Sequence, residues 1–119
     1  MLPAVIYYFH VIHRWAGLCQ HPLFRMDKGY YMAKFMCTHT FPPGQFSADE
    51  IRELARAAQE DPIVRGYRAF ANTAQGKAIC VMEAPTKEAV AVWFNEMGMP
   101  VDTITQVELE GDRGIVQST

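Results

Sequence analysis

The sequence predicts an α+β fold with element order βαββαβ, in which an antiparallel four-stranded sheet carries two helices on one face. Three observations predict this class. Alternating apolar positions indicate strands over residues 34–41, 63–73 and 102–110. A short apolar run at 78–84, bounded by a turn and a proline, indicates a buried strand. Two segments with apolar residues at helical spacing, each opening on a capping residue, lie between the strands.

The composition is that of an ordinary globular domain. Of 119 residues, 50% are hydrophobic and 20% are charged, which suits one domain with a substantial core. The net charge of −2 gives no electrostatic reason to expect nucleic acid, and no apolar run is long enough to predict a membrane partner. Three cysteines without a secretory cleavage pattern predict reduced thiols and a cytoplasmic protein.

Residues 1–31 differ from the predicted domain at 32–119. The apolar stretch from Leu2 to Phe9 is interrupted by His10 and His13. Such a segment could be a failed signal peptide, an appended helix or an over-called start, that is, a start position assigned too far upstream. We favour an over-called start, because residues 32–34 resemble a natural beginning and the fold pattern starts there.

The first strand, 34–41, places Cys37 and His39 on one face because side chains alternate along a strand. A Pro-Pro-Gly turn follows. Ser47 and Glu50 then form a capping box that opens the first helix. That helix ends at an Asp-Pro pair, where proline disfavours helical backbone in the residue before it.

The second strand, 63–73, turns at Gly76, which can adopt a positive φ, into the third strand at 78–84. Simple alternation along the second strand places Arg65 with Tyr67 on one face, and Arg68 with Phe70 on the other. Tyr67, Arg68 and Phe70 would line a small-molecule pocket or a dimer surface.

A proline ends the third strand, and Thr86 caps the second helix. Trp93 and Phe94 lie on its predicted core face, and Gly98 predicts its end.

The fourth strand is predicted over 102–110. Ile104 is out of step with Val107 and Leu109, which predicts a bulge. Ile115 and Val116 in the tail predict a short fifth strand.

This order is that of the ferredoxin-like fold. Both helices cover one face of the sheet, whereas apolar residues lie on both faces of the strands. An open apolar sheet face commonly marks a partner surface, so we expect a homodimer that packs through sheet faces or strand edges.

The run Gly76-Lys77, then CVMEAP at 80–85 and KEAV at 87–90, resembles a bacterial family of small ferredoxin-like proteins typified by a nickel-responsive, nickel-binding protein. The similarity extends from about Met32 to Glu108, and the EAP turn is its most specific part. The resemblance implies a dimer, with nickel at the dimer surface in the described branch, and no established enzymatic reaction.

The chain departs from this family near the end of the second helix. Family members often have histidine there, just before a proline, where this chain has Met97-Gly98-Met99-Pro100. Thioethers thus replace an imidazole ligand, which puts nickel binding by this member in question.

Three residues are candidates for metal binding or catalysis. Thiolate and imidazole from Cys37 and His39 suit nickel, copper or zinc, and Cys80 with Met82 forms a second same-face pair on the neighbouring strand. Glu83, the one charge in its strand, is a candidate metal ligand, or an acid–base partner of His39. The structural alternatives are core packing for the thiols, a hydrogen bond within the sheet for His39, and helix N–H groups or a basic partner for Glu83.

Three functional hypotheses follow. The first is a non-enzymatic cytoplasmic homodimer of the nickel-responsive type that binds Ni²⁺ or another transition metal weakly through His39 and nearby groups. The second is a dimeric small-molecule enzyme that uses His39 and Glu83 as acid and base. The third is a stress or interaction module without a ligand.

Overall fold

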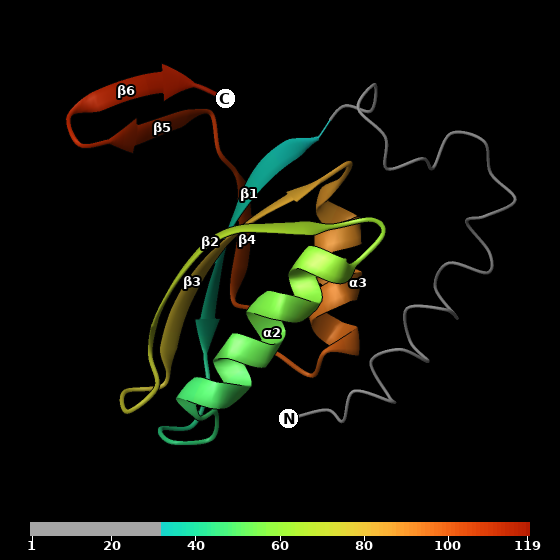
Figure 1. The fold of residues 1–119 in the computed structure, drawn as a ribbon, viewed down its shortest axis with the longest axis vertical. Helices are drawn as coiled ribbons and strands as arrows, with labels where there is room; N and C mark the ends of the chain where they lie inside the picture. The colour runs from blue at the N-terminus through green and yellow to red at the C-terminus, as the bar shows by residue number, and fades with distance from the viewer. Residues whose placement is uncertain (1–31) are drawn as a thin grey trace, which may run out of the picture.

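The computed structural model describes residues 32–119 and confirms the α+β class (Figure 1). The predictions for residues 1–31, including His10 and His13, lie outside the described residues. The main sheet is built from β1 (Ala33–Thr40), β2 (Arg65–Asn72), β3 (Lys77–Ala84) and β4 (Thr103–Gln106). The helices are α2 (Ala48–Glu60) and α3 (Lys87–Glu96), and a separate hairpin is built from β5 (Leu109–Asp112) and β6 (Ile115–Ser118).

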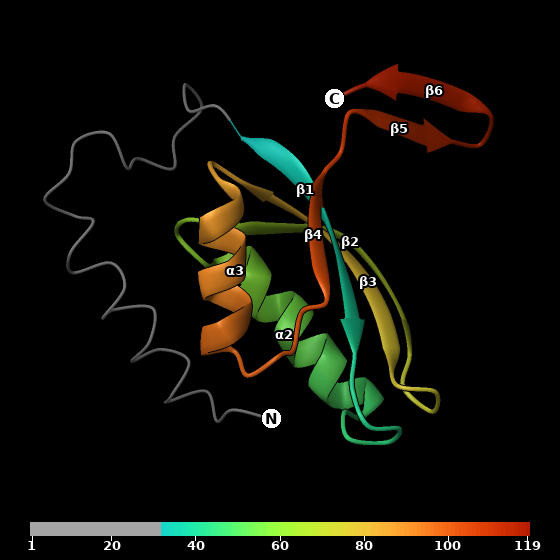
Figure 2. The same cartoon turned by 180° about the vertical axis from the view of Figure 1, so that it is seen from behind.

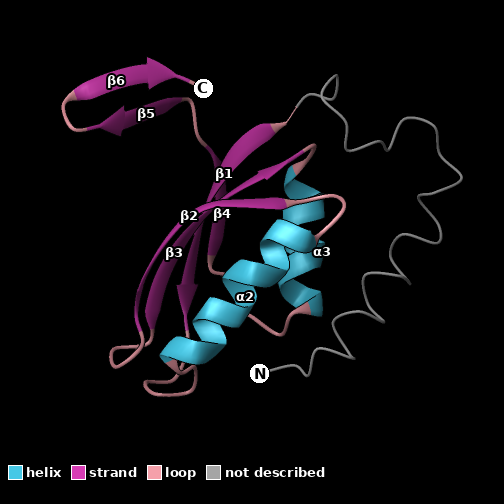
Figure 3. Ribbon diagram, viewed as in Figure 1, coloured by secondary structure: helices cyan, strands magenta, loops and turns pink. Residues whose placement is uncertain are grey.

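The main sheet is antiparallel with the order β2-β3-β1-β4, as the ferredoxin-like topology requires. Both helices lie on one side of it, which Figures 2 and 3 show from opposite directions. We call the helix-covered side the inner face and the opposite side the outer face. Phe35, Cys37 and His39 of β1 point to the inner face and are buried, so the predicted alternation is confirmed.

Local capping chemistry sets the helix boundaries. Ser47 accepts a hydrogen bond from the Glu50 N–H while the Glu50 carboxylate accepts one from the Ser47 N–H, which confirms the capping box. Thr86 accepts a hydrogen bond from the Ala89 N–H at the start of α3. Gly98 follows α3 with a φ of 73°.

The core lies between the inner face and the helices. Trp93 and Phe94 are buried there, as their spacing predicted. At the end of α2, the buried carboxylate of Asp61 accepts hydrogen bonds from the Ile63 and Val64 N–H groups and so fixes the entry into β2. Within residues 32–119, neither helix combines the length and hydropathy that crossing a bilayer requires.

The predicted fourth strand is wrong beyond residue 106. The Val107 N–H donates to the Lys34 carbonyl, after which the chain leaves the sheet edge and pairs with its own tail as the hairpin β5–β6. The irregular alternation around Ile104 therefore reflects two short strands and not a bulge. The predicted short fifth strand exists as β6, from Ile115 to Ser118, and it pairs only with β5 among the described strands.

The sheet does contain an irregularity, and it lies in β2. The register with β3 shifts between Gly66 and Arg68, so Tyr67 is the extra residue. The shift moves Arg65 to the same face as Arg68 and Phe70, which corrects the alternation predicted for this strand. All three point to the outer face, because they lie opposite outer-face residues of β3.

Candidate functional site

His39 lies in the core, on the inner face of β1. Its side chain is 1% exposed, and its ring lies 4.6 Å from that of Phe94, centroid to centroid. The Nδ1–H donates a 2.8 Å hydrogen bond to the Pro100 carbonyl. Burial lowers the pKa of His39, so the ring is neutral at pH 7. Its Nε2 has no hydrogen-bond partner among the described residues.

The two thiols near His39 are poor metal ligands in this environment. Cys37 and Cys80 lie opposite each other in the β1–β3 register. Burial raises the pKa of Cys37 to about 12 and that of Cys80 to about 11. Because the thiolate is the form that binds metals, both side chains would first have to lose a proton that burial retains.

Glu83 is not a neighbour of His39. In the strand registers, Glu83 lies opposite Lys34 of β1 and Arg65 of β2, and its side chain points to the outer face. His39 lies opposite Ala78 and points to the inner face. The predicted acid–base pair therefore cannot form within one chain, and Glu83 cannot join Cys37 and His39 around one metal ion. No group of three His, Cys, Asp or Glu side chains suited to a metal occurs within residues 32–119.

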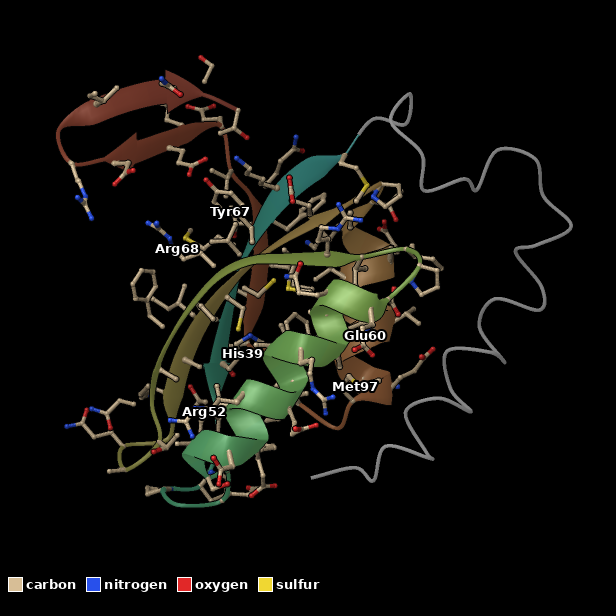
Figure 4. All side chains as sticks on the ribbon, in the orientation of Figure 1. His39, Arg52, Glu60, Tyr67, Arg68 and Met97 are labelled. Atoms are coloured by element: carbon tan, nitrogen blue, oxygen red, sulfur yellow. The ribbon has the colours of Figure 1, made fainter. Side chains whose placement is uncertain are left out.

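Tyr67, Arg68 and Phe70 all line one cleft beside β2, although their side chains point in different directions. Arg68 and Phe70 project from the outer face, while Tyr67 leans toward the hairpin, as Figure 4 shows for Tyr67 and Arg68. The Tyr67 hydroxyl donates to the Glu110 carboxylate. Lys34 Nζ lies 2.7 Å from Glu110 Oε1 and 4.1 Å from the centre of the Tyr67 ring.

This contact of Lys34, Tyr67 and Glu110, which we call the clasp, fixes the base of the hairpin. The hydrogen bond from Lys34, followed by that from Tyr67, lowers the pKa of Glu110. Sequence reasoning missed the clasp because it treated Glu110 as part of the fourth strand. The one signal available was the pair of glycines, Gly111 and Gly114, which favours a turn there over a continued strand.

The outer face carries large apolar side chains without cover. Met36 is 42% exposed, Phe70 62% and Ile79 43%, and they come from three neighbouring strands. We call these three residues the outer strip. No other described element packs over it, as Figure 2 shows for the ribbon.

These features define a class of small proteins with ferredoxin-like topology, an open sheet face and no multi-ligand metal cluster among residues 32–119. The chain belongs to the nickel-responsive SCO4226-like family, whose model matches residues 35–107. It is also similar to the crystal structure of SCO4226 from Streptomyces coelicolor A3(2), with 29% identity and a TM-score of 0.56 over 66% of this chain and 100% of that one. No curated protein matches the chain.

Proposed function

We propose that this protein is a non-enzymatic, nickel-binding homodimer of the nickel-responsive type. Its two copies pair through the outer strip. The observation that carries the proposal is the exposure of Met36, Phe70 and Ile79 side by side on three neighbouring strands of the sheet. Contiguous apolar surface of this kind is unfavourable in water and typically marks an interface. A second copy covers it with the same residues around a twofold axis.

The hairpin supports the same arrangement. It projects beyond the sheet on the side away from the helices (Figures 1 and 2), and its Leu109, Ile115 and Val116 side chains are more than half exposed. An isolated two-stranded hairpin is marginally stable in water, so a partner surface would stabilise it. The family match ends at Val107, before the hairpin begins.

Charged side chains surround the outer strip. Arg65 and Arg68 lie on the outer face of β2, at one edge of the sheet. Within the same chain Tyr67 of β2 donates to Glu110 of the hairpin, and the charge of Arg68 helps to lower the pKa of Glu110. These groups would form a polar rim beside the apolar centre of a dimer interface.

Metal contact is a second part of the proposal, and one observation favours it. In His39, Nδ1 is fixed by a backbone carbonyl and Nε2 lacks a partner among the described residues, which is how metal-binding histidines are commonly oriented. The described residues therefore supply one ligand for Ni²⁺, the Nε2 of His39, and do not complete a coordination shell. The ring is also buried, so a metal reaches it only after local opening, and binding is weak.

Equilibrium dialysis of the full chain against Ni²⁺, with the molar mass measured by light scattering in the same samples, tests both parts. The background variant replaces His10, His13 and His21 with glutamine, so that His39 is the only histidine left of the four. We expect a dimer with weak, saturable nickel binding that His39→Gln removes. Unchanged nickel content in His39→Gln would exclude His39 as a ligand. A mass of 13.5 kDa at every concentration would refute the dimer independently.

A further inference from the structure

A cleft of about 340 Å³ lies on the inner face, between α2 and strands β2 and β3. Trp93 and Phe94 of α3 line it together with Met99. This volume is at the lower end of the roughly 300–1,000 Å³ typical of small-molecule sites. Phe70 of the outer strip also borders the cleft, at the edge strand β2.

Small side chains create the cleft. Its walls include Ala55, Ala58, Ala69, Ala71, Ala78 and Gly66. At Gly66, α2 and β2 approach closely, because an added Cβ would lie 3.1 Å from the Ala58 Cβ. Ala69 and Ala71 belong to the inner face of β2, opposite Cys80 and Ala78, yet both are exposed. The cleft therefore opens to solvent along β2, whereas protein cores normally leave few voids larger than a water molecule.

Polar side chains also line the cleft, among them Gln59, Tyr67, Arg68 and Trp93. Trp93 is 1% exposed, and its indole N–H has no hydrogen-bond partner among the described residues. A buried donor without a partner is unfavourable, and an acceptor on a ligand would satisfy it. Cys80 also lines the cleft and keeps its proton at neutral pH, so it brings no negative charge.

We infer that this cleft binds a mainly apolar small molecule of about two fused rings, whose single acceptor oxygen takes the hydrogen bond of the Trp93 indole. The alanines make room for the rings, and a cationic ligand is disfavoured because Arg68 lines the cleft and no acidic side chain does. Phe70 borders both the cleft and the outer strip, but Trp93, Phe94 and the alanines of the cleft wall lie on the inner side of the sheet. The cleft can therefore be present whether or not the chain dimerises.

Two probes of matched shape test the inference by isothermal titration calorimetry on the full chain. 1-Acetylnaphthalene carries a carbonyl acceptor, and 1-ethylnaphthalene does not. We expect 1-acetylnaphthalene to bind with a dissociation constant below about 1 mM and to bind about threefold to tenfold more tightly than 1-ethylnaphthalene. Trp93→Phe should remove this difference between the probes while leaving both bound.

Filling the cleft should block both probes. Ala69→Leu and Ala71→Leu each place a larger side chain in it, and we expect at least about tenfold weaker binding from each. Both positions are exposed, so the variants should keep the wild-type circular dichroism and dimer mass. Ala91→Leu, on an exposed position of α3 that does not line the cleft, is the matched control and should bind as wild type. Absence of binding to the wild-type chain, or wild-type affinity in both filled variants, would overturn the inference.

Discussion

Replacing Gly76 with alanine is expected to destabilise the protein by about 3 kcal/mol or more. Gly76 has a φ of 68°, in the left-handed region that side chains disfavour. An added Cβ would also lie 1.9 Å from the Phe41 carbonyl oxygen, which is fixed backbone. The Phe41 N–H donates to the Gly76 carbonyl at 3.0 Å, so relieving the clash would break a hydrogen bond that ties the end of β1 to the β2–β3 turn.

Gly98 provides the matched control for this prediction. It has a φ of 73°, but nothing lies within 4 Å of an added Cβ. Gly98→Ala should therefore cost only the backbone term, about 1 kcal/mol. Urea unfolding followed by circular dichroism measures both variants. Equal losses in Gly76→Ala and Gly98→Ala would show that the close approach at Phe41 does not constrain the turn.

Replacing Phe70 with aspartate is expected to weaken dimerisation by about a hundredfold or more. Phe70 is the most exposed member of the outer strip, and a second copy would bury its ring. A carboxylate at that position would lose its hydration on association. The dissociation constant is measured by sedimentation equilibrium on the full chain.

The control for this change is Val92→Asp. Val92 is 46% exposed on α3, on the helix side of the sheet, so its substitution introduces the same charge away from the proposed interface. We expect Val92→Asp to leave the dissociation constant within about twofold of wild type. A similar weakening by both variants would mean that net charge, and not the outer strip, governs association.

Local chemistry made most of the fold predictable. The capping box of Ser47 and Glu50, the cap at Thr86 and the apolar stripe of α3 all depend on residues within a few positions of one another. The register shift in β2 lies instead beside Gly66, where β2 approaches Ala58 of α2 across the core. A single strand's own pattern does not contain that information, and the simple alternation therefore assigned Arg65 to the wrong face.

The candidate site was less predictable because it depends on strand register. Cys37 and His39 share a face, as alternation requires within one strand. Whether Glu83 of β3 joins them depends on the pairing between strands, and that pairing places it opposite Lys34 on the other face. The clasp at Glu110 likewise depends on where the chain leaves the sheet, which a hydrogen bond from Val107 to Lys34 decides.

Hydroxyl-radical footprinting of the unmodified full chain, at concentrations above and below the dissociation constant, tests most directly whether the open sheet face is where two copies meet. If the outer strip is the interface, Met36 and Phe70 are oxidised several-fold more slowly at high concentration, while Val92 reacts at the same rate throughout. Oxidation of Met36 and Phe70 that stays equally fast at every concentration, in a sample whose mass shows a dimer, would place the interface elsewhere on the molecule.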